Sequence, residues 1–346
     1  MARPLQVIAI AVSLLLLACS PSEHDSVSLV VYSPHGKELL SDYEHRFEAR
    51  HPQVDVKWLE MGSQNVLDRL RSEKSNPQAD IWWGAPSDLF QQAGEEALLL
   101  PYRPTWAETV TPEARGSGDF WYGTYETPEV IAYNSALLKA KEAPQDWDDL
   151  LDPKWKGKII LRDPLASGTM RTIFCAMILR ELKRTGSLED GYRWLKKLDA
   201  NTKDYVPNLT ILSQKLARRE GSVTLWNMPD IELQRSRYGY PLEYVLPVSG
   251  MPIVIDGIAL VAKATPRPAA RDFYEFVSSK PELVRASRKF FRIPCRNDIP
   301  TAELPSWIGE TLISAMPLDR DLLRQHSREW MRYWDEHIRH KGEDGM

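Results

Sequence analysis

The chain has 346 residues, of which 43% are hydrophobic and 27% are charged, an ordinary composition for a globular protein. Its formal net charge is −4, and no basic stripe alternates with aromatic residues, which argues against a nucleic-acid-binding protein. The length suits two domains, and no heptads, repeats or low-complexity tracts stand out.

The N-terminal segment carries the features of an export signal. Arg3 precedes an apolar run over residues 5–18, which is shorter than the about 20 residues that span a bilayer. The run predicts a secretory signal peptide over residues 1–18, and the "LLAC" sequence resembles a bacterial lipobox, so we expect Cys19 to be lipidated. Residues 19–26 then form a tether. This predicts a periplasmic or cell-envelope protein anchored in a membrane by its lipid, with an uncleaved anchor as the alternative.

Strands and helices alternate in the first third of the mature chain. Apolar and β-branched runs predict strands at residues 27–33, 54–60 and 79–87, and the segments between them have helical spacing of apolar residues. The alternation indicates parallel βαβ units.

Small and polar residues follow these strands, at the sheet edge where ligands bind in parallel sheets. Each strand end opens a helix, whose first backbone N–H groups are free and attract anions. Ordinary helix capping could explain the small and polar residues at any one strand end. Their presence at three successive strand ends favours the interpretation that these ends form the rim of a shared cleft. The candidate ligand-binding residues here are Ser33, His35, Gly36, Ala85 and Ser87.

The small residues Ser167, Gly168 and Thr169 form a further candidate anion cradle between a proline-bearing loop and an apolar helix. Arg162 and Arg171 flank this cradle, and either could pair with an anion. A simply capped helix is the alternative. No lysine follows the cradle, so it departs from the phosphate-binding loop of nucleotide hydrolases.

Four other residues are candidates for contacting the remainder of a ligand. Trp226 and Asn227 end a strand, where the indole could stack on a sugar ring or pack in the core. Asp256 lies in an apolar strand, where an unpaired carboxylate is costly. It could bind ligand hydroxyls or an amine, or lock a hinge, and Glu126 has the same two interpretations.

The sequence contains no coherent catalytic site. It lacks a G-x-S-x-G motif, and its histidines show no metal-ligand spacing with carboxylates. We therefore predict no enzymatic activity, no bound metal and no cofactor. Cys175 and Cys295 could form a disulfide or remain separate thiols, because sequence spacing alone does not decide this.

The order of these segments resembles the periplasmic solute-binding proteins of ABC importers, in the group that includes ferric-iron, sugar-phosphate and aminoalkylphosphonate binders. The resemblance covers about residues 27–296. It is carried by "VVYSPHGKELL", "ADIWWGAPSDLFQQA", "GTYETPEVIAYN", "DWDDLLDPKWKGKIILRDPLASGT", "GSVTLWNMPD" and "MPIVIDGIALVAK".

The resemblance implies an α/β fold of two lobes, each a mixed sheet flanked by helices, joined by crossover strands near 129–133 and 253–260. The first lobe begins with residues 27–128, and residues 129–252 form the second. Residues 253–346 return through the hinge, complete the first lobe and form C-terminal helices that pack back on it. A solute held between the lobes would be delivered to a permease in the inner membrane, and we expect a monomer.

The nature of the solute remains open between three alternatives. Ferric-iron members of the group bring two adjacent tyrosines to the metal, whereas the corresponding loop here has Trp226 and Asn227. Fe³⁺ prefers anionic oxygen ligands, and the setting of Tyr238 and Tyr240 favours structural roles for both. The sequence therefore favours a small anionic solute with a phosphate or phosphonate group. Ferric iron is the first alternative, and an envelope lipoprotein that mediates interactions without transport is the second.

Overall fold

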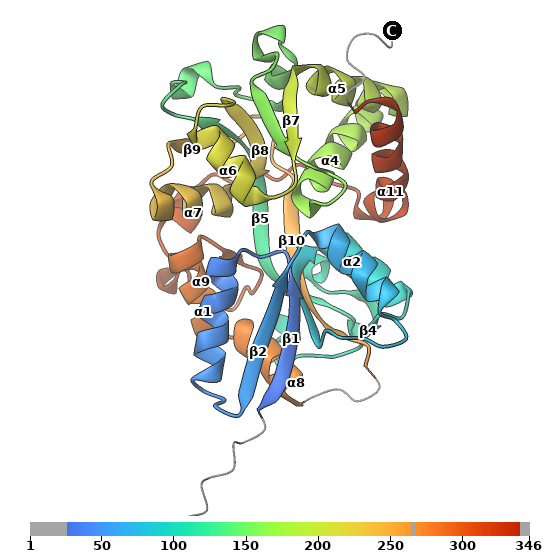
Figure 1. Ribbon diagram of the computed structural model, residues 1–346, viewed down its shortest axis with the longest axis vertical. Coiled ribbons are helices and arrows are strands. Elements are labelled where there is room, and N and C mark those ends of the chain that lie inside the picture. The colour runs from blue at the N-terminus through green and yellow to red at the C-terminus, as the bar shows by residue number, and fades with distance from the viewer. Residues whose placement is uncertain (1–25, 264–267, 340–346) are drawn as a thin grey trace, which may run out of the picture.

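The computed structural model describes residues 26–263 and 268–339, which form two lobes stacked along the long axis of the molecule (Figure 1). The predicted signal peptide and the lipidation of Cys19 lie outside the described residues. Within the described ranges, no helix combines the length and the apolar character that a bilayer crossing requires.

The first lobe is built on a sheet in the order β2-β1-β3-β10-β5. Strand β1 runs parallel to β2 and β3, which confirms the predicted βαβ units. Its strands other than the crossovers are β1 (Val27–Ser33), β2 (Val54–Glu60), β3 (Ile81–Pro86), β4 (Leu99–Leu100) and β11 (Ile293–Pro294). The second lobe contains β6 (Ile159–Arg162), β7 (Thr202–Val206), β8 (Val223–Asn227) and β9 (Leu242–Val245).

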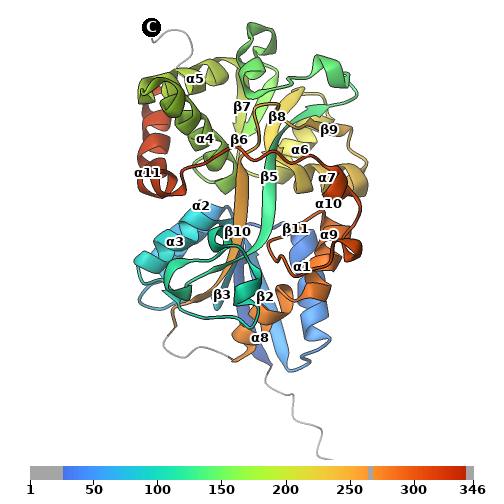
Figure 2. The same ribbon diagram turned by 180° about the vertical axis from the view of Figure 1, so that it is seen from behind.

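Two long crossover strands, β5 (Tyr122–Asn134) and β10 (Ile253–Val261), link the lobes, as the resemblance implies (Figures 1 and 2). The first half of β5 pairs with β10, and from Glu129 onward β5 pairs with β8 of the second lobe. The register of β10 shifts at Asp256, so this carboxylate lies at an irregularity on the path between the lobes.

Helices cover both sheets. In the first lobe, α1 buries Leu39, Leu40, Tyr43 and Phe47, whose spacing gives one apolar face. The helices of this lobe are α1 (Lys37–Glu48), α2 (Ser63–Ser72), α3 (Ser87–Glu95), α8 (Pro268–Val277) and α9 (Lys280–Phe290). Those of the second are α4 (Gly168–Thr185), α5 (Leu188–Asn201), α6 (Leu209–Ala217) and α7 (Met228–Tyr238), and α10 (Trp307–Glu310) and α11 (Arg320–His337) follow near the C-terminus.

The last helix, α11, buries its apolar face in the second-lobe core, and it also contacts α3 of the first lobe through the ion pair of Arg324 with Glu95 (Figure 2). Trp334 is fully buried and meets the ring of Phe174 at 5.4 Å and that of Tyr205 at 5.1 Å between centroids. These aromatic contacts explain the placement, whereas α8 and α9 belong to the first core.

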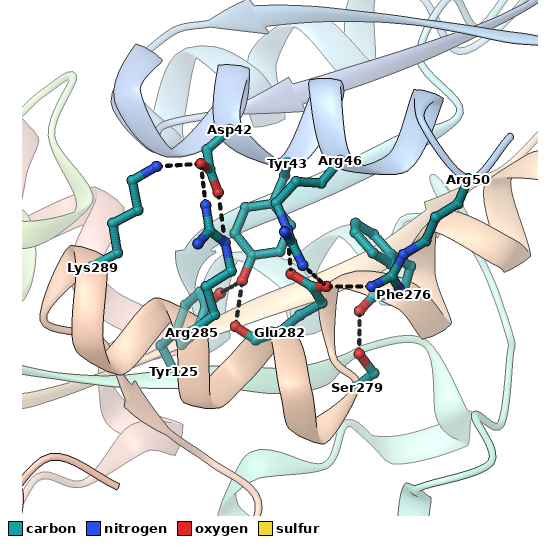
Figure 3. Close-up of polar contacts among 10 residues, drawn as sticks. All are labelled: Asp42, Tyr43, Arg46, Arg50, Tyr125, Phe276, Ser279, Glu282, Arg285 and Lys289. Carbon is teal, nitrogen blue, oxygen red and sulfur yellow. Dashed lines mark hydrogen bonds and ion pairs between the residues drawn. The ribbon is translucent and has the colours of Figure 1, made fainter. Parts of the chain in front are cut away.

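Ion pairs bind α9 to α1 in the first lobe (Figure 3). The side chain of Glu282 is fully buried and accepts hydrogen bonds from Arg46, at 2.6 and 3.0 Å, and from Arg50 at 3.1 Å. Asp42 likewise accepts a two-atom contact from Arg285. We call these five residues the α1–α9 cluster.

The two described cysteines are free and buried, and they lie in different cores. Cys175 belongs to the second-lobe core and Cys295 to the first, so the alternative of separate thiols holds. Burial raises the pKa of the Cys175 thiol to about 12.

Candidate functional site

The first-lobe wall of the cleft is formed where β1 leads into α1. The backbone N–H of His35 donates to the hydroxyl of Ser33 at 3.0 Å, which fixes the turn between strand and helix. His35 is 5% exposed and meets Trp83 and Tyr125 edge-on. Its Nε2 atom is buried without a partner among the described residues. Burial and the positive charge of Arg292 hold its pKa well below the usual range, so His35 is neutral and offers one donor or acceptor.

The neighbouring strand β3 leaves the sheet through an unusual backbone. Ala85 has a φ of 110°, in a region that residues with a side chain rarely adopt. Such conformations persist where the surrounding structure enforces them, often at functional sites. The strain lies at one of the predicted cleft-forming strand ends.

The second-lobe wall is the N-terminus of α4. The hydroxyl of Ser167 accepts a hydrogen bond from the backbone of Met170 at 3.3 Å, so the predicted cap is present. A Cβ atom at Gly168 would come within 2.6 Å of Pro86 and 2.8 Å of the Ser63 hydroxyl, both in the first lobe. A glycine is therefore needed for the two lobes to approach this closely.

Thr127 and Asp256 line the cavity from the crossover strands, and Glu129 lies on β5 outside this lining. The Thr127 hydroxyl donates to Asp256 at 2.6 Å. Glu129 is fully buried, and no described donor lies at normal hydrogen-bond distance from its carboxyl oxygens, although the Thr169 hydroxyl is near enough to lower its pKa. Burial, together with the negative charges of Asp256 and Asp230, raises the pKa of Glu129 well above its usual range. Burial also raises the pKa of Asp256, against the charge of Arg292.

Asp230, at the start of α7, contacts the other residues of the remaining wall. Its carboxylate accepts hydrogen bonds from Trp226 Nε1 at 3.0 Å and from Asn227 Nδ2 at 2.9 Å. It also pairs with Arg292 at 2.8 Å, which joins the second lobe to the first. The indole of Trp226 is thus held in place with one face toward Arg162, whose guanidinium lies 5.4 Å from the ring centroid.

Arg162, at the end of β6, is a cation of the cleft without a direct ion pair. It forms no hydrogen bond or ion pair with any described residue, and its Nε is buried. Burial lowers the pKa of the guanidinium, and the charges of Asp230 and Glu60 oppose this effect. An arginine nevertheless stays charged at any physiological pH.

These walls enclose a narrow cavity of about 40 Å³, which is room for a few water molecules. Its lining residues are Pro34, His35, Ser63, Pro86, Thr127, Arg162, Ser167, Gly168, Thr169, Trp226, Asn227, Asp230, Val254, Asp256 and Arg292. A wider space of about 470 Å³ shares Pro34 and Arg162 with it. Its walls include Glu60, Asn65 and Asn208, so the approach to the cavity is polar.

The structure brings many of the predicted residues together. The sequence candidates that line the cavity are His35, Ser167, Gly168, Thr169, Trp226, Asn227 and Asp256. The Ser33 hydroxyl accepts the backbone N–H of His35. Gly36 and Ser87 lie at the starts of helices and Ala85 lies at the end of β3, all outside the lining. The Ser87 hydroxyl instead accepts a hydrogen bond from Arg320 at 3.2 Å.

Glu126 does not line the cavity. Successive residues of a strand face opposite sides, so Thr127 and Glu129 share one face of β5 and Glu126 lies on the other. Sequence reasoning therefore placed an acid on the correct strand but on the wrong face.

Sequence analysis missed Glu129, Asp230 and Arg292, and assigned no binding role to Ser63 or Thr127. The strand parity of β5 could have pointed to Thr127 and Glu129. Nothing local marks Arg292, since it reaches the site only through its long-range ion pair with Asp230. Tyr238 and Tyr240 lie outside the cavity lining. Tyr238 donates a hydrogen bond to Glu38, and Tyr240 packs on the second core.

Two α/β lobes joined by two crossover strands, with a polar cavity between them, define the class of two-lobed solute-binding proteins. The chain belongs to the bacterial extracellular solute-binding protein family, whose model matches residues 43–308.

Relatives of known assignment fall in the same class. A protein of Salmonella paratyphi A assigned as a 2-aminoethylphosphonate-binding periplasmic protein is 29% identical, over 91% of this chain and 96% of its own. A protein of Sinorhizobium fredii assigned as an ABC transporter periplasmic-binding protein is 25% identical, over 94% and 90%. The periplasmic binding protein AfuA of Actinobacillus pleuropneumoniae, solved with fructose-6-phosphate bound, superposes with a TM-score of 0.79 and 25% identity, covering 90% of this chain and 99% of its own.

Proposed function

We propose that this protein is the substrate-binding component of an ABC importer and captures a small solute with a phosphate or phosphonate group. The observation that carries the proposal is Arg162, a cation at a narrow interlobe cavity that forms no direct ion pair or hydrogen bond with a described residue. The carboxylates of Asp230, Glu60 and Asp163 act on its charge only from a distance, so its N–H donors are free to bind an anion.

The surroundings of Arg162 suit an anion with several oxygen atoms. The N-terminus of α4 presents free backbone N–H groups at Gly168 and Thr169, and the hydroxyls of Ser63 and Thr169 supply further donors. An arginine binds two oxygens of a phosphate or phosphonate at once. A monovalent carboxylate would leave part of this donor set unused.

The opposite part of the cavity favours a solute that also carries donors. Asp256 and Asp230 line the cavity and are acceptors when ionised. An ammonium group or sugar hydroxyls would donate to such a set. The wider polar space beside Arg162 offers room for the remainder of a solute that the 40 Å³ cavity cannot hold.

Two relatives bear on this choice. The Salmonella protein is assigned to 2-aminoethylphosphonate, which has both an ammonium group and a phosphonate. AfuA holds fructose-6-phosphate, which has hydroxyls and a phosphate. Both solutes share the anionic group that Arg162 would bind.

A fluorescence titration tests the proposal. Purified protein would be titrated with 2-aminoethylphosphonate, with fructose 6-phosphate and, as a comparison, with ferric citrate, and the emission of Trp226 and its neighbours would be followed. We expect a saturable change with one of the two phosphorus-containing solutes, and its loss in R162Q. Saturation by ferric citrate alone would contradict the proposal in favour of iron. Silence with all three and with a wider solute library would favour an interaction protein without a transported solute.

Closure about the crossover strands would provide the mechanism. We infer a first lobe of residues 27–128 with much of the chain beyond residue 253, and a second lobe of residues 129–252. A solute that contacts Arg162 and His35 at once is bound fully only in the closed form, so it shifts the population toward that form. Small-angle scattering should show compaction on adding a confirmed solute, and an unchanged radius of gyration would contradict the mechanism.

We further infer that the chain is exported, lipidated at Cys19 and monomeric. The inference depends on the sequence of residues 1–19. Expression in a bacterial host followed by membrane fractionation should find the protein in the membrane fraction, and C19A should release it to the periplasm. Release of both forms, or membrane attachment of both, would contradict lipidation at this residue. Sedimentation of C19A would report the oligomeric state.

A further inference from the structure

A second polar groove lies outside the interlobe cavity, where α2, α4 and α11 meet (Figure 1). It encloses about 620 Å³. Its walls are formed by Gln64, Asp68, Leu165, Arg171, Gln325, Arg328, Glu329, Met331, Arg332 and Asp335. Helix α2 belongs to the first lobe, whereas α4 and α11 pack in the second core, so the groove crosses the boundary between the lobes.

The base of the groove is the buried side chain of Arg171, which is 8% exposed. It donates to the Leu165 carbonyl at 3.2 Å and to Gln64 across the lobe boundary, while its Nε has no partner among the described residues. Burial lowers the pKa of this guanidinium, and the charge of Arg328 acts in the same direction. Two like charges are therefore close enough to repel one another.

Arg328 and Arg332 add two further cations to this groove from one face of α11. Both side chains are exposed, and neither forms a hydrogen bond or ion pair with a described residue. They stand four residues apart, a spacing at which like charges on a helix repel one another. Helix α11 thus carries two arginines that repel one another and that both line the groove.

The acidic residues of the groove form no direct ion pair with these three arginines, although the charges of Asp68 and of Asp88 act on Arg171 and oppose the lowering of its pKa. Asp68 pairs with Arg71 at 2.8 Å, and Asp335 pairs with Arg339 at 3.1 Å, and both of these arginines lie outside the lining. Glu329 contacts the imidazole of His326 at 3.4 Å. The groove therefore holds three arginines against one carboxylate that lacks an arginine partner.

We propose that this groove binds a small multivalent oxyanion, such as a polyphosphate, through Arg171, Arg328 and Arg332. Several negatively charged oxygens on one molecule can contact all three guanidinium groups, each of which binds oxyanions by paired N–H donors. The site is distinct from the interlobe cavity and does not depend on which solute that cavity takes.

Isothermal titration calorimetry with inorganic pyrophosphate tests the proposal on the full chain. The double variant R328A/R332A removes the exposed cations, and K156A/R218A removes two exposed cations elsewhere as a control of equal charge. R162Q separates the groove from the interlobe cavity. We expect wild type, K156A/R218A and R162Q to bind pyrophosphate, and R328A/R332A to bind at least tenfold more weakly.

Three results would overturn the proposal. The first is that wild-type protein does not bind pyrophosphate. The second is that the two double variants lose affinity equally. The third is that R162Q alone loses affinity, which would place the pyrophosphate in the interlobe cavity. Because the exposed residues contribute little to the cores, all variants are expected to unfold at the wild-type urea concentration, and this measurement accompanies the titration.

Discussion

The α1–α9 cluster and the interlobe cavity both concentrate charge in a poorly hydrated place, but they differ in how completely that charge is paired. In the cluster, buried Glu282 has arginine partners at 2.6 and 3.1 Å, and Asp42 has its own (Figure 3). At the cavity, Arg162 forms no direct ion pair with a described residue, and the carboxyl oxygens of nearby Glu129 have no hydrogen-bond partner at normal distance among the described residues. Buried charges that are fully paired within the protein indicate a structural role. Buried polar groups that lack partners indicate a site at which a bound molecule supplies them.

The largest expected effect on stability would come from removing the charge of Glu282 in the α1–α9 cluster. E282Q leaves Arg46 and Arg50 without their shared counter-ion, and loss of one partner of a buried pair costs about 3 kcal/mol. We expect the free energy of unfolding in urea to fall by this amount, with solute affinity unchanged. An unfolding free energy within about 0.5 kcal/mol of wild type would show that the cluster is not structural.

Substituting Arg162 should have the opposite effects to E282Q on stability and on solute affinity. R162Q removes no ion pair between described residues, so stability should remain near wild type, while affinity for the phosphorus-containing solute falls by about 2 kcal/mol, or roughly thirtyfold. R46Q is the matched control, since it removes an arginine from the cluster and should lower stability without lowering affinity. Equal stability losses in the two variants would erase the distinction between the regions.

A smaller effect is expected from obstructing the approach of the lobes. G168A favours the helix locally, but its Cβ would stand 2.6 Å from Pro86. We expect about tenfold weaker solute binding, equivalent to about 1.4 kcal/mol, with less compaction in scattering. G309A is the control, because nothing lies within 4 Å of a Cβ atom at that position; equal effects in both variants would contradict the steric explanation.

The smallest effect concerns the pH dependence of stability. The pKa of Glu129 is raised in the folded state, so the folded protein holds the proton more tightly than the unfolded chain. This contribution is fully present below the unfolded pKa and is lost as pH rises toward the folded pKa. Urea unfolding of E129Q at pH 5 and pH 8 should show a smaller decline with pH than wild type. An equal decline, or the same reduction in the exposed control E310Q, would contradict the assignment.

The sequence predicted much of the fold because local patterns determine it. The strand at 27–33 and that at 54–60 have their predicted bounds, and the α4 cap at Ser167 is in place. The placement of α11 was not predictable in this way, since Trp334 has apolar spacing that fits either core and long-range packing decides between them.

The site was predicted only where its residues are local. Ser167, Gly168 and Thr169 follow one another in the chain, and their cavity position follows from the helix they begin. Asp230 and Arg292 lie far apart in sequence and form one unit only through the folded structure. The sequence places Arg162 beside the Ser167–Thr169 cradle. Whether a carboxylate forms an ion pair with it depends on the folded structure and cannot be read from the sequence.

The two buried thiols have a practical consequence. Cys175 and Cys295 lie in separate cores, and burial raises the pKa of both, so reagents that attack thiolates should leave them untouched. In a C19A background, cysteines introduced on the rims of the two lobes would therefore be the positions that maleimide dyes label. Single-molecule energy transfer between such dyes could then follow the distance between the lobes over time.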